Sequence, residues 1–280
     1  MVHLTDGYQA AATDDNSEAI KAQLTRLEED TAETVLSSFL TGLDTGTIRA
    51  AAPDTDGWTA TSWVKQGILA VFAHADNAER AGNTTDVLPL RDTTGLTNRG
   101  VRITPGATVR AGVHLGDNVT VMGGAYVNIG TWVGERSMVD SNVTVGSCAQ
   151  IGTDTHIGAN TLIGGVLEPV EDTPVIIGDD VSIGGGSVIT SGFEVGDGTV
   201  VAEDTLLTPR IEVYDLVDET VYHGHVKPDR RVFRRQLPSS LGEHELFAAA
   251  DLEVTKPVAV AIERGASPVE FEETLRVKSD

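Results

Sequence analysis

The sequence predicts a mainly β protein: a left-handed parallel β-helix, preceded by an N-terminal α-helical domain and followed by a mixed C-terminal extension. The first observation is that an Ile, Leu or Val returns at every sixth position from 103 to 207, with one interruption. This period fits neither an amphipathic helix nor an alternating strand. The second observation is that Gly often follows the aliphatic residue, as in Ile151-Gly152 and Ile183-Gly184. A fixed period of this kind indicates structural repeats that stack into one continuous core.

In such a repeat, each hexad supplies one short strand and one corner, and three hexads close one triangular coil. Successive coils lie about 4.8 Å apart, so residues three hexads apart become vertical neighbours. The aliphatic residues fill the interior, and glycine permits corner conformations that a side chain would resist. We therefore predict the β-helix at residues 96–210.

The repeat is interrupted between Ile163 and Ile177, where the step is fourteen residues rather than twelve. The segment 167–174 is polar and contains Pro169 and Pro174. We interpret it as a loop that leaves a corner and adds two residues to the regular repeat. Loops on a rigid scaffold commonly hold functional residues, and a tolerated surface insertion is the alternative.

The flanking segments lack the six-residue period. We predict the α-helical domain at residues 1–95, because three stretches have amphipathic helical spacing: 17–27, 31–43 and 61–72. Residues 53–57 indicate the tip of a hairpin. Residues 211–280 form the C-terminal extension, in which 212–226 and 246–262 are expected to be β segments.

The composition narrows the classes of partner. A net charge of −22, with 20 basic residues against 42 acidic ones, argues against nucleic acid and fits a protein that works in concentrated salt. No run of eighteen apolar residues exists and no signal peptide is evident, so we expect no membrane contact and a cytoplasmic location. The single cysteine, Cys148, excludes intrachain disulfides. No residues have the spacing of a zinc site, so we predict no metal.

A basic stretch stands out against this acidic background. Residues 227–235 contain five basic residues and one acid, and they include Arg230 and Arg231. We predict that this stretch binds an anion. The alternative is that these residues pair with carboxylates of the same or a neighbouring subunit.

Several motifs go beyond what the hexad rule demands. Within the repeats they are Ala125-Tyr-Val-Asn-Ile-Gly130, Met138-Val-Asp140, Val145-Gly-Ser-Cys-Ala-Gln-Ile-Gly152 and Ile163-Gly-Gly-Val-Leu-Glu-Pro169. Outside the repeats they are Trp58-x4-Trp63-Val-Lys65, Tyr222-His-Gly224 and Leu237-Pro-Ser239. Over roughly residues 30–260, the chain resembles the tetrahydrodipicolinate N-succinyltransferase family.

The resemblance implies an enzyme of lysine and diaminopimelate biosynthesis. It would transfer a succinyl group from its co-substrate succinyl-CoA to the amino nitrogen of the ring-opened, hydrated dicarboxylate, by direct attack and without a tightly bound cofactor. The family is homotrimeric, with active sites between neighbouring β-helices. The flat faces of a triangular prism suit such threefold packing.

By position in the Met138-Val-Asp140 motif, Asp140 matches the family's acidic catalytic residue. Arg102, within Arg102-Ile-Thr-Pro105, matches its substrate-binding arginine. A base helps because an attacking amine must lose a proton, and a guanidinium can hold a carboxylate in two parallel hydrogen bonds. A corner-capping Asx-turn is the alternative for Asp140, and a surface salt bridge is the alternative for Arg102. His156 follows Asp140 by sixteen residues, so we expect the two to be near neighbours, with a structural role for His156.

The remaining candidates concern CoA and the cleft. Arg230, Arg231, Gly164 and Gly165 are the candidate CoA contacts. Ser147 and Glu168 lie in the same motifs as cleft-lining candidates, and Cys148 is expected to be an ordinary thiol because direct transfer needs no nucleophilic cysteine.

The chain departs from the family at two positions. Val188 stands where the family has a second acidic residue. Either Asp140 is sufficient for catalysis, or Glu194 or Glu203 serves in place of the missing acid. Related N-acetyltransferases have a similar apolar residue there, which makes acetyl-CoA the alternative donor. Asn142 stands where the family commonly has tryptophan.

Two readings without acyl transfer remain as alternatives. One is a non-catalytic trimeric β-helix scaffold. The other is a carbonic anhydrase of the same fold, which needs three histidines for its zinc. The repeats offer only His114 and His156, so this second reading is weak.

Overall fold

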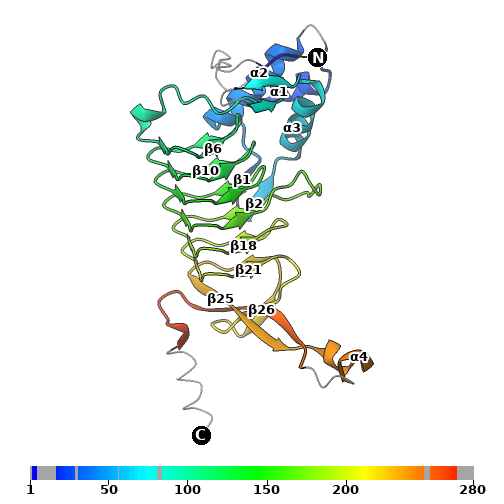
Figure 1. Ribbon diagram of the computed structural model, residues 1–280, viewed down its shortest axis with the longest axis vertical. Coiled ribbons are helices and arrows are strands. Elements are labelled where there is room, and N and C mark those ends of the chain that lie inside the picture. Colours follow the sequence, from blue (N-terminus) through cyan, green and yellow to red (C-terminus); the bar gives the residue numbers. More distant parts are fainter. Residues whose placement is uncertain are drawn as a thin grey trace.

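The computed structural model describes residues 2–4, 17–28, 31–55, 57–80, 84–248 and 253–269. Its centre is the predicted left-handed parallel β-helix, with helices at the N-terminal end and long strands at the C-terminal end (Figure 1). None of the helices in these ranges combines the length and the apolar character that crossing a bilayer requires.

Short parallel strands form one sheet along each side of the triangular coil. Trp132 pairs with His114 on one side and Gln150 on the other, eighteen residues away in each direction, so the ladder has the predicted coil period. The strands of the first sheet's coils are β5 (Arg102–Ile103), β8 (Thr120–Val121), β11 (Met138–Val139), β14 (His156–Ile157), β17 (Ser182–Ile183) and β20 (Val200–Val201). Those of the second sheet are β6 (Thr108–Val109), β9 (Tyr126–Val127), β12 (Thr144–Val145), β15 (Leu162–Ile163), β18 (Val188–Ile189) and β21 (Leu206–Leu207). Those of the third sheet are β7 (His114–Leu115), β10 (Trp132–Val133), β13 (Gln150–Ile151), β16 (Ile176–Ile177), β19 (Glu194–Val195) and β24 (His225–Val226).

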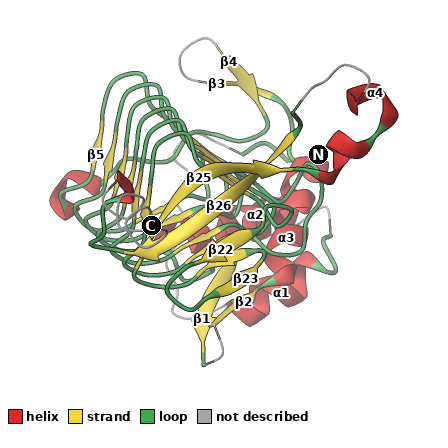
Figure 2. Cartoon of the chain, turned by 90° about the horizontal axis from the view of Figure 1, so that it is seen from below, coloured by secondary structure: helices red, strands yellow, loops and turns green. Residues whose placement is uncertain are grey.

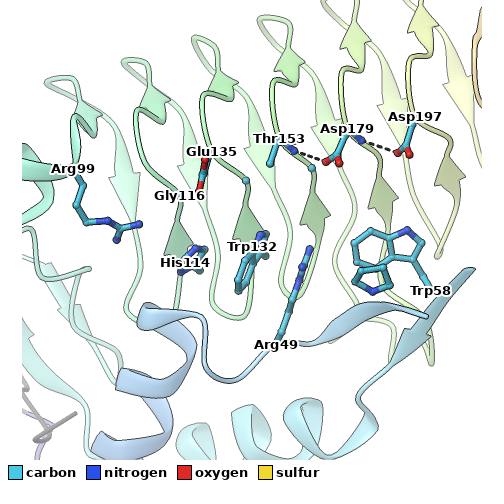
Figure 3. Close-up of a pocket in the computed structure, with 13 residues that line it drawn as sticks. Arg49, Trp58, Arg99, His114, Gly116, Trp132, Glu135, Thr153, Asp179 and Asp197 are labelled. Atoms are coloured by element: carbon cyan, nitrogen blue, oxygen red, sulfur yellow. Dashed lines mark hydrogen bonds between the residues drawn. The ribbon is translucent and has the colours of Figure 1, made fainter. Parts of the chain in front are cut away.

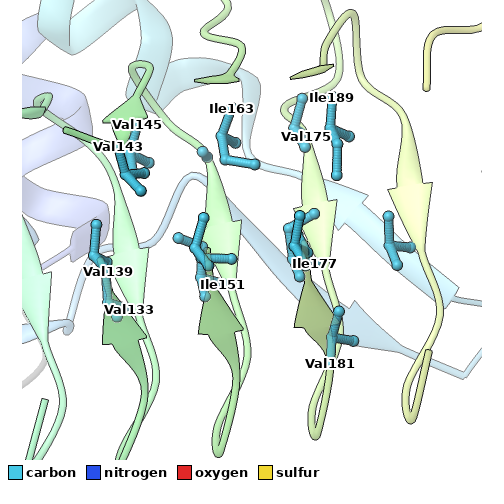
Figure 4. Packing of buried hydrophobic residues seen from close by; sticks show 14 of the residues in the cluster. Val133, Val139, Val143, Val145, Ile151, Ile163, Val175, Ile177, Val181 and Ile189 are labelled. Atoms are coloured by element: carbon cyan, nitrogen blue, oxygen red, sulfur yellow. The ribbon is translucent and has the colours of Figure 1, made fainter. Parts of the chain in front are cut away.

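The aliphatic residue of each hexad lies inside the coil. Val133, Ile151 and Ile177 follow one another along the stack, and all three are fully buried (Figure 4). Their removal from water is the main favourable term in forming the stack.

The corners require unusual backbone conformations and close packing. Many contain a residue with positive φ, such as Asn118 at 59° and Gly130 at 77°, and Asn and Gly adopt this conformation most readily. At Gly146 a Cβ atom would lie 2.2 Å from the backbone nitrogen of Gly165 in the next coil. Glycine is therefore needed at that corner for the coils to approach.

The predicted loop at 167–174 leaves the corner between the second and third sheets. Its length was underestimated, because Ile163 and Ile177 lie on successive sides of the coil. The regular step would be six residues and the observed step is fourteen, so the insertion adds eight residues, not two. Ile151 and Ile177 still pair in register across it.

The three predicted helices and the hairpin are confirmed in the N-terminal region. They are α1 (Ser17–Leu24), α2 (Ala32–Thr45) and α3 (Ser62–His74), and the hairpin consists of β1 (Ala51–Asp54) and β2 (Gly57–Ala60). A second hairpin and a 3-10 helix were not predicted: β3 (Ala78–Arg80), β4 (Thr84–Asp86) and η1 (Leu96–Arg99). Leu36, Phe39 and Ile68 pack with Ile129 and Cys148 of the β-helix, so the helices cover the corner between the second and third sheets.

The C-terminal extension is only partly as predicted. Strands β22 (Val213–Asp215), β23 (Thr220–Tyr222) and β24 confirm the β prediction for 212–226, and β24 continues the coil stack beyond residue 210. The prediction for 246–262 is wrong at its start, where α4 (Glu245–Ala248) and the preceding 3-10 helix η2 (Ser240–Glu243) lie, and right from β26 (Thr255–Glu263) onward. Residues 249–252 lie outside the described residues.

The basic stretch is part of a long strand that the sequence reasoning missed. Strand β25 (Arg230–Pro238) pairs antiparallel with β26 along its whole length, and near its start it also pairs parallel with β20. Val232 and Phe233 are buried within it. Figure 2 shows β25 and β26 lying across the end of the coil stack.

Candidate active site

Asp140 lies at the corner that follows β11, between the first and second sheets. Its Oδ1 atom accepts a hydrogen bond of 2.6 Å from the backbone N–H of Ser141. The side chain is 26% exposed, so one face of the carboxylate remains open to a ligand. The local hydrogen bond joins adjacent residues, whereas the Asx-turn alternative would join residues two positions apart.

His156 is the near neighbour of Asp140 that the sequence predicts. It lies in β14 directly opposite Met138 of β11, and its Nε2 is 3.4 Å from Oδ2 of Asp140. The N–H of Ser141 holds the pKa of the Asp140 carboxyl below its usual range; the hydrogen bond from His156 acts in the same direction, and partial burial opposes both. Asp140 is thus stabilised as a carboxylate.

Arg102 lies on the same sheet as this pair. It starts β5 and is exposed, and Thr120 separates it from Met138 in the ladder. Two coil steps, about 10 Å, therefore separate Arg102 from β11, the strand that precedes Asp140. Binding of substrate by Arg102 stays a prediction.

The described residues contain no group of three His, Cys, Asp or Glu arranged to hold a metal ion. The chemistry that Asp140 and His156 offer is proton transfer and hydrogen bonding. An imidazole beside a carboxylate is a common arrangement for both.

Comparison with known proteins identifies the family. A model described as the N-terminal part of tetrahydrodipicolinate N-succinyltransferase matches residues 14–73. A bacterial transferase hexapeptide model matches 130–165, and a model of the hexapeptide repeat of succinyl-transferase matches 106–128 and 174–204. The 2,3,4,5-tetrahydropyridine-2,6-dicarboxylate N-succinyltransferases of Idiomarina loihiensis, Sodalis glossinidius and Acinetobacter baylyi are 36%, 35% and 37% identical to this chain. The matches cover 80%, 78% and 75% of this chain, and 84%, 82% and 79% of those relatives.

This chain belongs to the tetrahydropyridine-dicarboxylate N-succinyltransferase family. The resemblance on which the sequence interpretation depended is thereby confirmed.

The structure locates the positions at which this family member departs from the expected pattern. Val188 lies in β18 on the second sheet, between Leu162 and Leu206 in the ladder. Glu194 lies on the third sheet, and Glu203 follows β20, three coils beyond Asp140 and so about 14 Å along the stack. Within one chain, neither glutamate is close to Asp140.

The backbone conformation at position 142 suits asparagine in this member of the N-succinyltransferase family. Its φ is 58°, in the left-handed region that Asn tolerates and large side chains avoid. A Cβ atom on Gly124 in the preceding coil would lie 2.1 Å from its Oδ1 atom. The asparagine therefore packs directly against a glycine corner.

The glycine pair predicted to contact CoA has a packing role. A Cβ atom on Gly164 would lie 3.0 Å from Cα of Thr190, and one on Gly165 would lie 2.7 Å from the nitrogen of Ser147. Close approach of neighbouring coils thus explains both glycines. Contact of Gly164 and Gly165 with CoA stays a prediction.

Arg230 forms ion pairs with carboxylates of the same chain, as the alternative interpretation of the basic stretch expected. Its Nε lies 3.1 Å from Oδ2 of Asp215, whose side chain is fully buried, and its terminal nitrogen lies 3.0 Å from Oδ2 of Asp218. Nε of Arg231 donates to the carbonyl of Arg264. CoA binding by Arg230 and Arg231 stays a prediction, and Arg230 could bind phosphate only by leaving a buried carboxylate, which is costly.

Cys148 should not react with a thiol reagent such as DTNB in the native protein. It is 2% exposed, and burial raises the pKa of its thiol to about 12, so almost none is present as the reactive thiolate. We expect the reaction at neutral pH to be no faster than unfolding. Because the chain has one cysteine, the denatured protein supplies the control, one reactive thiol per chain. Rapid labelling of the native protein would contradict this.

Sequence reasoning missed a second cluster, on the third sheet. The rings of His114 and Trp132 stack with centroids 3.9 Å apart, and the Arg49 guanidinium lies 4.0 Å from the Trp132 centroid. A signal was present: the outward positions of β7, β10 and β13 hold His114, Trp132 and Gln150, whereas Thr occupies several such positions elsewhere. Large side chains there indicate a side that another part of the chain covers.

Proposed function

We propose that this chain is a tetrahydrodipicolinate N-succinyltransferase. It transfers the succinyl group of succinyl-CoA to the amino nitrogen of the ring-opened, hydrated acceptor in the cytoplasm, and it releases CoA. The observation that carries the proposal is the Asp140–His156 pair at a partly open corner of the β-helix, with Asp140 in the Met138-Val-Asp140 motif.

The geometry supports a division of work between the two residues. Asp140 has a lowered pKa, which makes it a weak proton acceptor. When Nε2 of His156 donates to Asp140, the other ring nitrogen becomes an acceptor. In our proposal His156 takes the amine proton and Asp140 orients the imidazole.

The bond changes then balance without an acyl-enzyme. The amine nitrogen forms the amide bond with the succinyl carbonyl carbon, and the carbon–sulfur bond of the thioester breaks. The CoA sulfur leaves with the electron pair, and His156, which has taken the amine proton, delivers that proton to the sulfur. Cys148 takes no part, because its thiol is buried and protonated.

Arg102 supplies the anchor for the acceptor in this proposal. Arg102 is exposed on the same sheet, two coil steps (about 10 Å) from the strand before Asp140 and three steps (about 14 Å) from His156. A carboxylate bound there by two hydrogen bonds leaves the far end of the acceptor free to reach His156.

A homotrimer completes the site in this proposal. In one chain the His156 side chain is 48% exposed and that of Asp140 26%. Acyl transfer is favoured where water is excluded and charges are held by fixed dipoles. A neighbouring β-helix packed against this corner would supply that exclusion.

The decisive experiment compares acyl donors. The purified protein, in concentrated salt with tetrahydrodipicolinate, should release CoA thiol with a higher kcat/KM for succinyl-CoA than for acetyl-CoA. A preference for acetyl-CoA would assign the N-acetyltransferase alternative, which the apolar Val188 favours. Release from neither donor would contradict acyl transfer and favour the scaffold.

A further inference from the structure

A second cleft lies away from Asp140, along the third sheet. One wall is the N-terminal segment with Arg49 and the β1–β2 hairpin, and the other is the β-helix itself (Figure 3). Its volume is about 470 Å³, which lies in the range of small-molecule sites. Asp140 is at the corner between the first and second sheets, so the two sites are on different sides of the coil.

Arg49 is held firmly at the centre of this cleft. Its guanidinium lies 4.0 Å from the centroid of Trp132 and 5.0 Å from that of Trp58. Its Nε donates a 2.7 Å hydrogen bond to Oε1 of Gln150, a fully buried side chain. The amide nitrogen of Gln150 donates to the carbonyl of Cys148 at 2.8 Å, which fixes the orientation of the amide. The charged end of Arg49 is therefore preorganised.

Arg49 forms no ion pair with a carboxylate among the described residues. Burial lowers the pKa of its guanidinium to about 10, and the charge of Asp179 acts in the opposite direction. Other mostly buried arginines, with side chains 11–13% exposed, each pair with a carboxylate: Arg91 with Asp44, Arg110 with Asp86 and Arg230 with Asp215. A desolvated cation without a counterion is unfavourable. The terminal nitrogens of Arg49 thus offer unused donors to an anionic group.

The β-helix side of the cleft is acidic. Asp179 accepts a 2.6 Å hydrogen bond from the backbone N–H of Thr153, and Asp197 accepts one of 2.8 Å from that of Asp179 (Figure 3). Each of these bonds uses only Oδ1. Both residues are exposed, so their second oxygens face the cleft mouth and its solvent. This wall favours a cationic group and disfavours a phosphate-rich ligand.

We propose that the cleft binds a free α-amino acid. The terminal nitrogens of Arg49, whose guanidinium lies over the rings of Trp58 and Trp132, hold the carboxylate, and Asp179 and Asp197 hold the ammonium group. Because three carboxylates (Glu135, Asp179 and Asp197) line the cleft against two arginines (Arg49 and Arg99), an amino acid with a second ammonium group binds more tightly than an acidic one. Binding at this cleft requires neither CoA nor Asp140, so it can be tested independently of acyl transfer.

Tryptophan fluorescence tests the proposal directly, because Trp58 and Trp132 line the cleft and the chain has only three tryptophans. The full-length protein is titrated without CoA, using L-lysine, L-glutamate and succinate as probes at constant ionic strength. L-Lysine should change the fluorescence saturably, and L-glutamate should bind more weakly. Succinate, which lacks an ammonium group, should bind most weakly. The absence of a saturable response to L-lysine, with no heat in calorimetry, would overturn the proposal.

Variants assign the signal to the cleft. Arg49→Gln should raise the Kd for L-lysine by about tenfold or more, because a charge-assisted contact is lost. Exposed Arg234 supplies the matched control, and Arg234→Gln should bind as the native protein does. Asp140→Asn should also leave the Kd unchanged, which separates this site from the active site. An unchanged Kd in Arg49→Gln would overturn the assignment.

A double variant tests the proposal even if Arg49→Gln does not fold. The double variant Asp179→Asn, Asp197→Asn keeps the Oδ1 acceptors and removes both charges. It should lose the preference for L-lysine over succinate while keeping carboxylate binding. An unchanged preference would show that the acidic wall does not contact the ligand and would overturn that part of the proposal.

Discussion

Asp140→Asn should lower kcat for succinyl transfer by roughly 10²- to 10⁴-fold, because the imidazole that takes the amine proton loses the carboxylate that orients it. Asparagine nearly matches the shape of aspartate and can still accept the hydrogen bond from Ser141. It has no charge to orient and stabilise the imidazolium that forms when His156 takes the amine proton. Initial rates of CoA thiol release, measured at saturating succinyl-CoA, report this loss.

Asp204→Asn is the control, because Asp204 is another corner aspartate of the same stack and lies three coils beyond Asp140. It should retain the native rate. His156→Asn should lower kcat by a comparable factor, because it removes the proposed proton acceptor. A near-native kcat in Asp140→Asn would remove Asp140 from the mechanism.

Ile151→Ala should lower the free energy of unfolding by about 2–5 kcal/mol. Ile151 is fully buried between Val133 and Ile177, and the hydrogen-bonded ladder on either side limits how far the coils can close around the cavity. Denaturant unfolding, followed by far-ultraviolet circular dichroism, measures the difference.

Leu162→Ala is the control for this substitution. Leu162 occupies the outward position of β15 and is 40% exposed, so truncation there should cost less than about 1 kcal/mol. Equal losses at the two positions would mean that the interior ladder is not the main source of stability.

The β-helix was predictable because its interior accepts little except a stacked aliphatic residue, and this imposes a period that the sequence displays. The helices α2 and α3 were predictable for a similar reason, since each buries one face against the coils. The eight-residue insertion was misjudged because hexad counting does not reveal which side of the coil each strand occupies.

Strand β25 and the cleft were not predictable in the same way. The charged residues of β25 concealed a strand whose buried positions are only Val232 and Phe233. Arg49 and Trp132 meet only because the N-terminal domain docks on the third sheet, and their separation in sequence gives no sign of it. The neighbourhood of Asp140 and His156 was predictable, because the coil period alone brings residues sixteen apart together.

The hydrogen-bond ladder sets distances along the first sheet in whole coil steps. The insertion at 167–174 changes the surroundings of a corner, yet Ile151 and Ile177 remain in register across it. Corner loops can therefore reshape the walls of a site gradually while the spacing between Arg102 and Met138 stays constant. Only the gain or loss of an entire coil alters that spacing, in jumps of about 4.8 Å. In the proposed site, the length of acceptor that fits therefore changes in whole coil steps, whereas corner loops adjust chemical selectivity gradually.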